Sequence, residues 1–319
     1  MRIIKRVLLS VVAIVIVVIV GLLAIFAYRS ANYYKLVETD KPIEAQYTAL
    51  GPYKVSYQEF DSENAAFKKN EIWYPSDMNK SESPLPLVIM ANGTGITASK
   101  YKAVFKHLAS WGFIVVGNED ENSRTGASSS ASLNFMLSLN KDRTSDFYGK
   151  IDVDNIGIGG HSQGGVGTIN AVTKQDNGNY YKAMYTASTT SSFWGQEGQL
   201  GTDWSYDVSK VHIPTFMVAG TGSFDAGTAE DIMATEGQGI TPLWSLQKNY
   251  ADIPHTVTKV MARRVNTDHG DMLTHADGYM TAWFMYWLKA DVQAGNVFFG
   301  DDAEILTNAN WQDVTRSPQ

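Results

Sequence analysis

The sequence predicts an α/β fold: a mostly parallel central sheet with helices on both faces, preceded by one N-terminal transmembrane helix. Three observations support this prediction. Continuous apolar runs such as Leu85–Ala91 (LPLVIMA) are typical of strands that are buried on both faces. These runs alternate with segments of helical periodicity, as in parallel strands joined by helical crossovers. The first segment of the chain is apolar over a length that crosses a bilayer.

The composition is that of a globular protein with a sizeable core. Of the 319 residues, 44 % are hydrophobic and 18 % are charged. There is no cysteine, which excludes disulfides, thiol catalysis and lipid attachment through an N-terminal cysteine. The net charge is −7, although the first 30 residues hold four basic groups and no acidic ones. Because the remainder is acidic, we expect no binding to nucleic acid or to an anionic membrane surface.

Residues 1–28 are predicted to form a short cytoplasmic stub and a transmembrane signal anchor. The segment Val7–Ala27 carries no charge, and a helix of this length crosses the ~30 Å hydrocarbon layer. Three basic residues precede it, so the positive-inside rule keeps the N-terminus in the cytoplasm and exports the rest. We therefore expect a single-pass protein of the cell membrane. The alternative is secretion after signal cleavage, although residues 25–27 are a poor cleavage site.

The remaining elements follow in order along the chain. Residues 29–50 are mixed and polar and are expected to be a linker to one domain over residues 51–319. Strands are expected over residues 53–57, 71–74, 85–91, 113–117, 156–159, 182–186, 215–219 and 256–262, from their apolar runs. Helices are expected over residues 99–111, which Gly112 can end, 131–139, 165–173 and 278–290. The connections at 188–212 and 221–255 are unusually long, and we expect them to shape a ligand cleft.

The segment Gly160–Gly164 (GHSQG) matches G-x-S-x-G, in which a serine sits on a sharp strand-to-helix turn. Glycine at both flanking positions lets the helix and a neighbouring strand approach closely enough to hold that strained serine. A predicted strand precedes the motif and a predicted helix follows it. Ser162 is therefore the candidate nucleophile. A dinucleotide motif beginning at Gly157 fails at its last position, so no cofactor is expected.

A second motif, Asn92–Gly95 (NGTG), directly follows the strand predicted at 85–91. In folds with a G-x-S-x-G turn, a backbone N–H at this point helps to bind an oxyanion. The two donors would be the backbone N–H groups of Thr94 and Gln163. An ordinary glycine turn is the alternative interpretation.

The base and the acid are expected in the chain order nucleophile, acid, base. His269 lies directly after the last predicted strand and is the candidate base, with His275 as the alternative. Asp225 is the first carboxylate after the strand predicted at 215–219 and is the candidate acid, with Asp231 as the alternative. The other four histidines are expected to be structural.

Five stretches of the sequence carry a family resemblance: LASWGFIVVGNEDENS, DFYGKIDVDNIGIGGHSQGG, VHIPTFMVAGTGSFDAG, NTDHGDML and TAWFMYWLKAD. Together they resemble the cutinase-like polyesterases and the related lipases and chlorophyllase-type esterases of the α/β-hydrolase superfamily, over roughly residues 50–305. The resemblance implies an α/β-hydrolase fold. It also implies a triad of Ser162, Asp225 and His269, with Thr94 and Gln163 as the oxyanion hole.

The chain departs from this family pattern in three respects. Gln163 stands where a methionine is usual, which makes the floor of the pocket more polar. The disulfide of that family is impossible without cysteine. The connections at 188–212 and 221–255 are longer than a compact, open cleft allows. These departures argue against polymer hydrolysis and leave ester hydrolysis in place.

The sequence thus predicts a serine hydrolase that cleaves small-molecule or lipid esters through an acyl-enzyme, without cofactor or metal. Phe193 and Trp194 are candidates for an acyl or aryl pocket, with simple packing as the alternative. The acidic residues 119–121 are interpreted as a solvated loop rather than a metal site. Two rivals remain: an amide or peptide hydrolase with the same triad, and an inactive surface binding module on a hydrolase fold.

Overall fold

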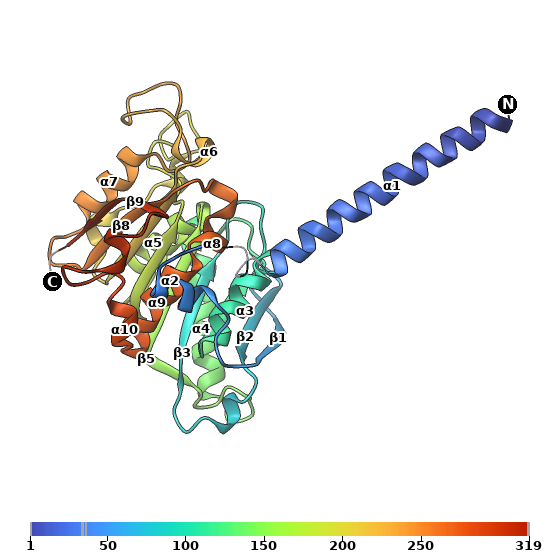
Figure 1. Cartoon of the computed structure of the whole chain (residues 1–319). Coiled ribbons are helices and arrows are strands. Elements are labelled where there is room, and N and C mark those ends of the chain that lie inside the picture. Colours follow the sequence, from blue (N-terminus) through green and yellow to red (C-terminus); the bar gives the residue numbers. More distant parts are fainter. Residues whose placement is uncertain (1, 33–34, 36, 318–319) are drawn as a thin grey trace.

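The computed structural model describes residues 2–32, 35 and 37–317. Position 1 of the predicted anchor, positions 33, 34 and 36 of the predicted linker, and positions 318–319 of the predicted domain lie outside the described residues. In the described part of the chain, nine strands form one sheet in the order β1-β2-β4-β3-β5-β6-β7-β8-β9 (Figure 1).

The strands are β1 (Val55–Asp61), β2 (Lys69–Pro75), β3 (Leu85–Ala91), β4 (Ile114–Asn118), β5 (Ile151–His161), β6 (Tyr181–Ala187), β7 (Thr215–Gly220), β8 (Lys259–Arg264) and β9 (Trp311–Arg316). The α-helices are α1 (Arg2–Ala31), α2 (Pro42–Thr48), α3 (Lys102–Ser110), α4 (Ala127–Lys141), α5 (Gln163–Lys174), α6 (Ser223–Ala226), α7 (Leu243–Asp252), α8 (Met272–His275), α9 (Asp277–Lys289) and α10 (Val292–Gly295).

The sheet is parallel in its centre and antiparallel at its edges. The pairings β4–β3, β3–β5, β5–β6, β6–β7 and β7–β8 are parallel. The pairings β1–β2, β2–β4 and β8–β9 are antiparallel. The prediction of a mostly parallel sheet is therefore confirmed.

Helices cover both faces of this sheet, as predicted. Strand β3 shows why both faces must be covered, since Val88 packs into one apolar core and Leu87 into the other. Helices α2, α3, α9 and α10 contribute to the core that contains Val88. Helices α4, α5 and α7 contribute to the core that contains Leu87.

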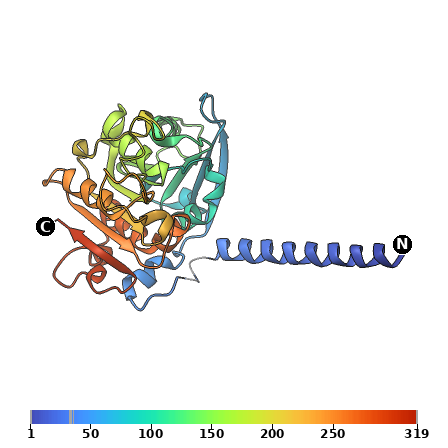
Figure 2. The same ribbon diagram turned by 90° about the horizontal axis from the view of Figure 1, so that it is seen from above.

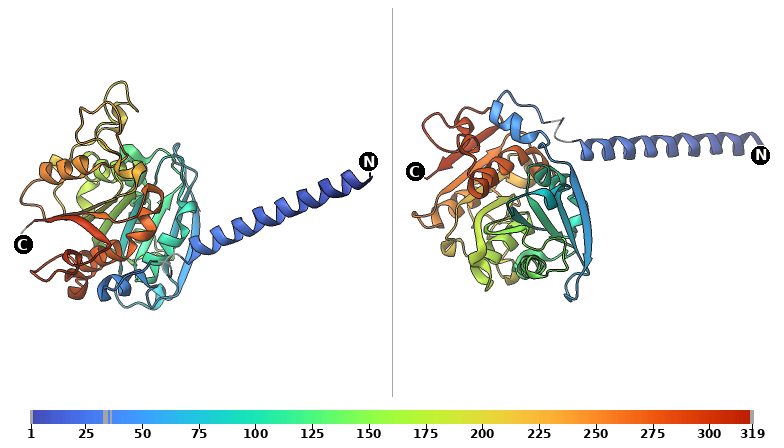
Figure 3. Two further views of the ribbon diagram at one scale, coloured as in Figure 1. Left: turned by 45° about the horizontal axis from the view of Figure 1, so that its top comes forward. Right: turned by 90° about the horizontal axis from the view of Figure 1, so that it is seen from below.

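Helix α1 stands clear of the domain in every view (Figures 1, 2 and 3). Its segment Leu9–Arg29 is 21 residues long and is apolar enough to cross a membrane, judged by length and composition alone. None of the side chains that the structure describes in this apolar segment is buried against the domain. A signal sequence passes the same test of length and composition.

Helix α2 lies inside the segment expected to be a linker, and it packs on the domain instead. The carboxylate of Glu304 accepts the backbone N–H groups of Ile43 and Glu44, both at 2.8 Å, at the first turn of this helix. The buried Glu44 carboxylate in turn pairs with Arg264 of β8 at 2.6 Å. Residues 42–48 therefore pack on the domain in the structure, through partners that lie more than 200 positions away in the sequence.

The other differences from the predicted elements are local. The helix predicted over residues 99–111 is a 3-10 turn (Ala98–Lys100) followed by α3. The connection at 221–255 contains α6 and α7. Strand β9 was not predicted, because its sequence WQDVTR has no continuous apolar run and pairs only along the sheet edge.

Candidate active site

Four loops bring the predicted residues to one edge of the sheet. Strands β3, β5, β7 and β8 are parallel, so their carboxyl ends lie at the same edge, where α/β folds bind ligands. Thr94 follows β3, Ser162 follows β5, Asp225 follows β7 and His269 follows β8.

Ser162 occupies the sharp turn between β5 and α5. Its backbone has φ 60° and ψ −123°, in the region that non-glycine residues rarely adopt. A Cβ at Gly160 would lie 2.2 Å from the carbonyl oxygen of Gly164, and one at Gly164 would lie 2.2 Å from that of Ala91. Neighbouring backbone lies so close to these two positions that only glycine fits. This close packing holds the serine in its strained conformation.

Hydrogen bonds join Ser162, His269 and Asp225 in one chain. Nε2 of His269 lies 2.9 Å from Oγ of Ser162, and Nδ1 of His269 lies 2.9 Å from Oδ1 of Asp225. Because an ionised carboxylate only accepts, Nδ1 carries the proton, and Nε2 is left to accept the proton of the serine hydroxyl. This is the arrangement that makes a serine nucleophilic.

Asp225 is fully buried at the acid end of this chain. Its second oxygen, Oδ2, accepts the hydroxyl of Ser188 and the backbone N–H of Gly220, both at 2.6 Å. With Nδ1 of His269 on Oδ1, the carboxylate has three donors. A buried charge needs such partners, because burial without them is strongly unfavourable.

Asp268 is bonded to the two loops that carry the candidate acid, Asp225, and the candidate base, His269. It accepts the backbone N–H groups of His269 and Asp225 at 2.8 Å and of Phe224 at 3.2 Å. Partial burial acts to raise the pKa of Asp268, but these N–H groups outweigh it, so the pKa lies below the usual value. Asp268 was not among the residues predicted from the sequence. The available signal was its place before a short 3-10 turn, where an aspartate caps free N–H groups.

His161, the residue before Ser162 in the G-x-S-x-G motif, is bonded to the candidate base, His269. Its Nε2 donates to the carbonyl oxygen of His269 at 2.7 Å, and the two imidazole rings lie 4.6 Å apart. Burial, followed by the neighbouring His269, lowers the pKa of His161 to about 4. His161 is therefore neutral at pH 7, and it fixes the backbone of His269 without adding a charge.

The two predicted oxyanion residues lie side by side. Gln163 is the first residue of α5 and is fully buried, whereas Thr94 is exposed in the loop after β3. The side-chain Nε2 of Gln163 donates to Oγ1 of Thr94 at 3.0 Å. Two backbone bonds also hold this loop: Gly93 N–H donates to the Tyr101 hydroxyl at 3.0 Å, and Gly95 N–H donates to the Glu121 carbonyl at 3.2 Å.

The alternative base and acid lie in other surroundings. Nδ1 of His275 is bonded to the carbonyl oxygen of Asp271 at 3.0 Å. Asp231 is exposed, and its carboxylate accepts the backbone N–H groups of Met233 and Ala234 from its own loop. The structure brings Asp225 rather than Asp231, and His269 rather than His275, to Ser162.

The predicted pocket residues join the two long connections to each other. Phe193 is buried and packs edge-on against Trp194 at 5.1 Å. Nε1 of Trp194 donates to the carbonyl oxygen of Gly239 at 3.0 Å, which ties the connection at 188–212 to that at 221–255. Their role in binding an acyl or aryl group stays a prediction.

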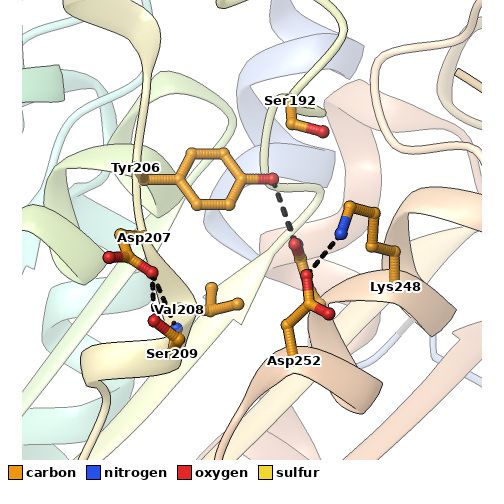
Figure 4. Close-up of a pocket in the computed structure, with 8 residues that line it drawn as sticks. Ser192, Tyr206, Asp207, Val208, Ser209, Lys248 and Asp252 are labelled. Carbon is orange, nitrogen blue, oxygen red and sulfur yellow. Dashed lines mark hydrogen bonds and ion pairs between the residues drawn. The ribbon is translucent and has the colours of Figure 1, made fainter.

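A separate pocket of about 370 Å³ lies between α7 and the segment around Asp207 (Figure 4). Tyr206, Lys248 and Asp252 are among the residues that line it, and none of Ser162, Asp225 and His269 does. The described residues contain no group of three or more His, Asp or Glu side chains that could hold a metal ion.

Comparison with protein families gives one match that covers most of the chain. A family described as PET hydrolase-like matches residues 31–294. A comparison with curated proteins gives no match. The matched range contains all the residues brought together around Ser162.

Proposed function

Because the chain belongs to the PET hydrolase-like family, we propose that it is a serine hydrolase that cleaves carboxylic esters with Ser162, His269 and Asp225. The family is an α/β-hydrolase family related to the cutinase-like polyesterases. The observation that carries the proposal is the unbroken chain from nucleophile to base to acid, with two contacts of 2.9 Å.

The proposed reaction has two stages. Oγ of Ser162 attacks the ester carbonyl carbon while Nε2 of His269 takes the hydroxyl proton. Asp225 stabilises the imidazolium, and the backbone N–H groups of Thr94 and Gln163 bind the negative oxygen of the tetrahedral intermediate. The intermediate collapses to an acyl-enzyme as His269 returns the proton to the departing alcohol. Water, deprotonated by His269, then attacks the acyl-enzyme. The bond to Oγ of Ser162 breaks as His269 returns the proton to that oxygen, and the carboxylic acid leaves.

Small-molecule and lipid esters are the substrate class that we propose first. A polyester is the second candidate, and the family description supports it. The polar Gln163 beside the nucleophile and the two long connections argue for the smaller substrates. An amide hydrolase would use the same residues, whereas the complete chain of hydrogen bonds argues against an inactive binding module.

The test of the activity uses the full chain, purified in detergent, on p-nitrophenyl esters from acetate to decanoate. We expect Ser162→Ala to lower kcat/KM by ~10³-fold or more. Ser138→Ala, an exposed serine on α4, is the matched control and is expected to act like the wild type. Equal activity of Ser162→Ala and the wild type would disprove the mechanism.

The same protein also decides between the substrate classes. Release of soluble acid from a PET film at a rate comparable with short soluble esters would establish the polyester reading. A folded protein that cleaves none of the esters would direct the assignment to amides or to binding.

We further propose that α1 anchors the domain in the cell membrane, with the domain outside the cytoplasm. The apolar segment Leu9–Arg29 and the basic residues before it support this placement. Protease added to intact cells should digest the domain, and the protein should stay in the membrane fraction with its N-terminus intact. A soluble extracellular form that starts after residue 27 would show signal cleavage and secretion instead.

A further inference from the structure

We propose that Ser188 is a positioning residue that couples the acid to the nucleophile through the end of strand β6. This inference rests on the function proposed above. Ser188 directly follows β6 and is fully buried. Its hydroxyl donates to Oδ2 of Asp225 at 2.6 Å, on the carboxylate whose other oxygen faces His269.

The backbone of Ser188 is held in an unfavourable conformation. Its φ of 48° lies in the left-handed region, which residues with a Cβ rarely adopt. Such strain persists only where the surroundings fix it, and it concentrates at functional sites. Here the N–H of Ser188 donates to the carbonyl oxygen of Val218 on β7 at 2.7 Å. This bond ties Ser188 to β7, the strand that leads to Asp225.

The residues on either side of Ser188 are bonded to the nucleophile. The carbonyl oxygen of Ala187 accepts the N–H of Ser162 at 2.9 Å, and the N–H of Thr190 donates to the carbonyl oxygen of Ser162 at 3.4 Å. A Cβ at Gly165, in the first turn of α5, would lie 2.3 Å from Oγ1 of Thr189. Residues 187–190 therefore connect the backbone of the nucleophile with the side chain of the acid.

This connection has two consequences for the reaction. The Ser188 hydroxyl fixes Oδ2 of Asp225, and so it fixes the angle at which Oδ1 meets Nδ1 of His269. It also stabilises the negative charge on Asp225, which makes that carboxylate a weaker partner for the imidazolium. Loss of the hydroxyl should misplace His269 and slow the chemical step. The other ionisable groups facing His269 are His161 and Asp268, and neither is changed by such a substitution.

The test compares Ser188→Ala and Ser188→Gly in the full chain, with soluble esters over a range of pH. Both variants lack the hydroxyl, but only glycine relieves the backbone strain. We expect both to lose roughly 10- to 100-fold in kcat with little change in KM, as for a hydrogen bond to a charged group. Because the hydroxyl donates to the charged carboxylate of Asp225, the pH profile of kcat/KM should change in both. Ser191→Ala, a buried serine three residues on, is the matched control, with wild-type values expected.

The outcomes separate this inference from the proposed function. If Ser162→Ala abolishes activity while Ser188→Gly retains wild-type kcat and pH profile, Ser188 has no positioning role. If the loss in Ser188→Ala only follows a loss of folded protein, and Ser188→Gly recovers it, the residue is structural and the inference is overturned. If Ser162→Ala itself is fully active, the proposed function fails first.

Discussion

The two sides of Ser162 are built in different ways. On the acid side, Asp225 is fully buried, Asp268 binds three backbone N–H groups, and Ser188 and His161 add further bonds. On the oxyanion side, Thr94 is exposed, and one side-chain bond, from Gln163, reaches it. The acid side therefore holds its side chains by several hydrogen bonds, whereas on the oxyanion side one bond holds the side chain of Thr94 and the loop is fixed through its backbone, as at Gly93 and Gly95.

The two sides differ in their hydrogen bonds because the roles proposed for them differ. A buried carboxylate and a base must keep their geometry without water, so every polar atom there needs a protein partner. Oxyanion donors are backbone N–H groups whose place is set by the strand and helix that carry them. Substitutions on the acid side should therefore cost far more activity than side-chain changes on the oxyanion side.

The largest effect is expected at the acid itself. Asp225→Asn should lower kcat by about 10⁴-fold, because the amide favours the wrong tautomer of His269. Asp231→Asn is the control, since the exposed Asp231 carboxylate accepts two backbone N–H groups of its own loop. Steady-state kinetics on a soluble ester measures both. A large loss in Asp231→Asn together with an active Asp225→Asn would reverse the assignment of the acid.

Asp268→Asn should give the next largest loss, roughly 10- to 100-fold in kcat/KM. The charge that gathers the N–H groups of Asp225 and His269 is removed, and small displacements of catalytic groups are costly. Asp271→Asn, in the same loop but exposed, should stay near wild type. Equal losses in the two variants would mean that the loop responds to any change and that Asp268 has no special part.

Much of the fold and the centre of the site could be predicted from local patterns. Strand β3 was bounded correctly because its apolar run is continuous, and Ser162 was found because glycine spacing marks the turn. Strand β9 and helix α2 could not be found in this way. Their stability depends on the sheet edge and on Glu304 and Arg264, which no local pattern connects to them.

The supporting residues of the site were missed for the same physical reason. The hydroxyl of Ser188 donates to Asp225, 37 positions away. Asp268 caps the adjacent His269, which is a local signal, but its bonds to Phe224 and Asp225 span 44 and 43 positions and exist only in the folded chain. His161 was expected to be structural, and its bond to the His269 carbonyl joins segments 108 positions apart. Sequence motifs mark groups that react, whereas the groups that hold them are identified by contacts.

His161, on the acid side, should also make the free energy of unfolding depend on pH. Since the folded state lowers the pKa of His161 to about 4 from an ordinary value near 6.5, the unfolded chain binds its proton first. Above about pH 6.5 His161 is neutral in both states and does not change the free energy of unfolding. As the pH drops toward 4 the free energy of unfolding falls, by roughly 2 kcal/mol at pH 5. Chemical unfolding at pH 7 and pH 5 measures it. His161→Gln, which keeps a donor for the His269 carbonyl, should lose less stability over this interval; an equal loss would assign the effect elsewhere.

The smallest effect is expected on the oxyanion side, from Gln163→Met. The backbone N–H that we propose as an oxyanion donor stays, and only the side-chain bond to Thr94 is lost, so we expect kcat to fall by roughly 3- to 10-fold. Thr94→Val removes the acceptor of the same bond and should have a similar effect. If the bond is what matters, the double variant should be no worse than either single one. Additive losses would mean that each side chain acts separately, and a loss near that of Asp225→Asn would show the oxyanion loop to be as tightly constrained as the acid side.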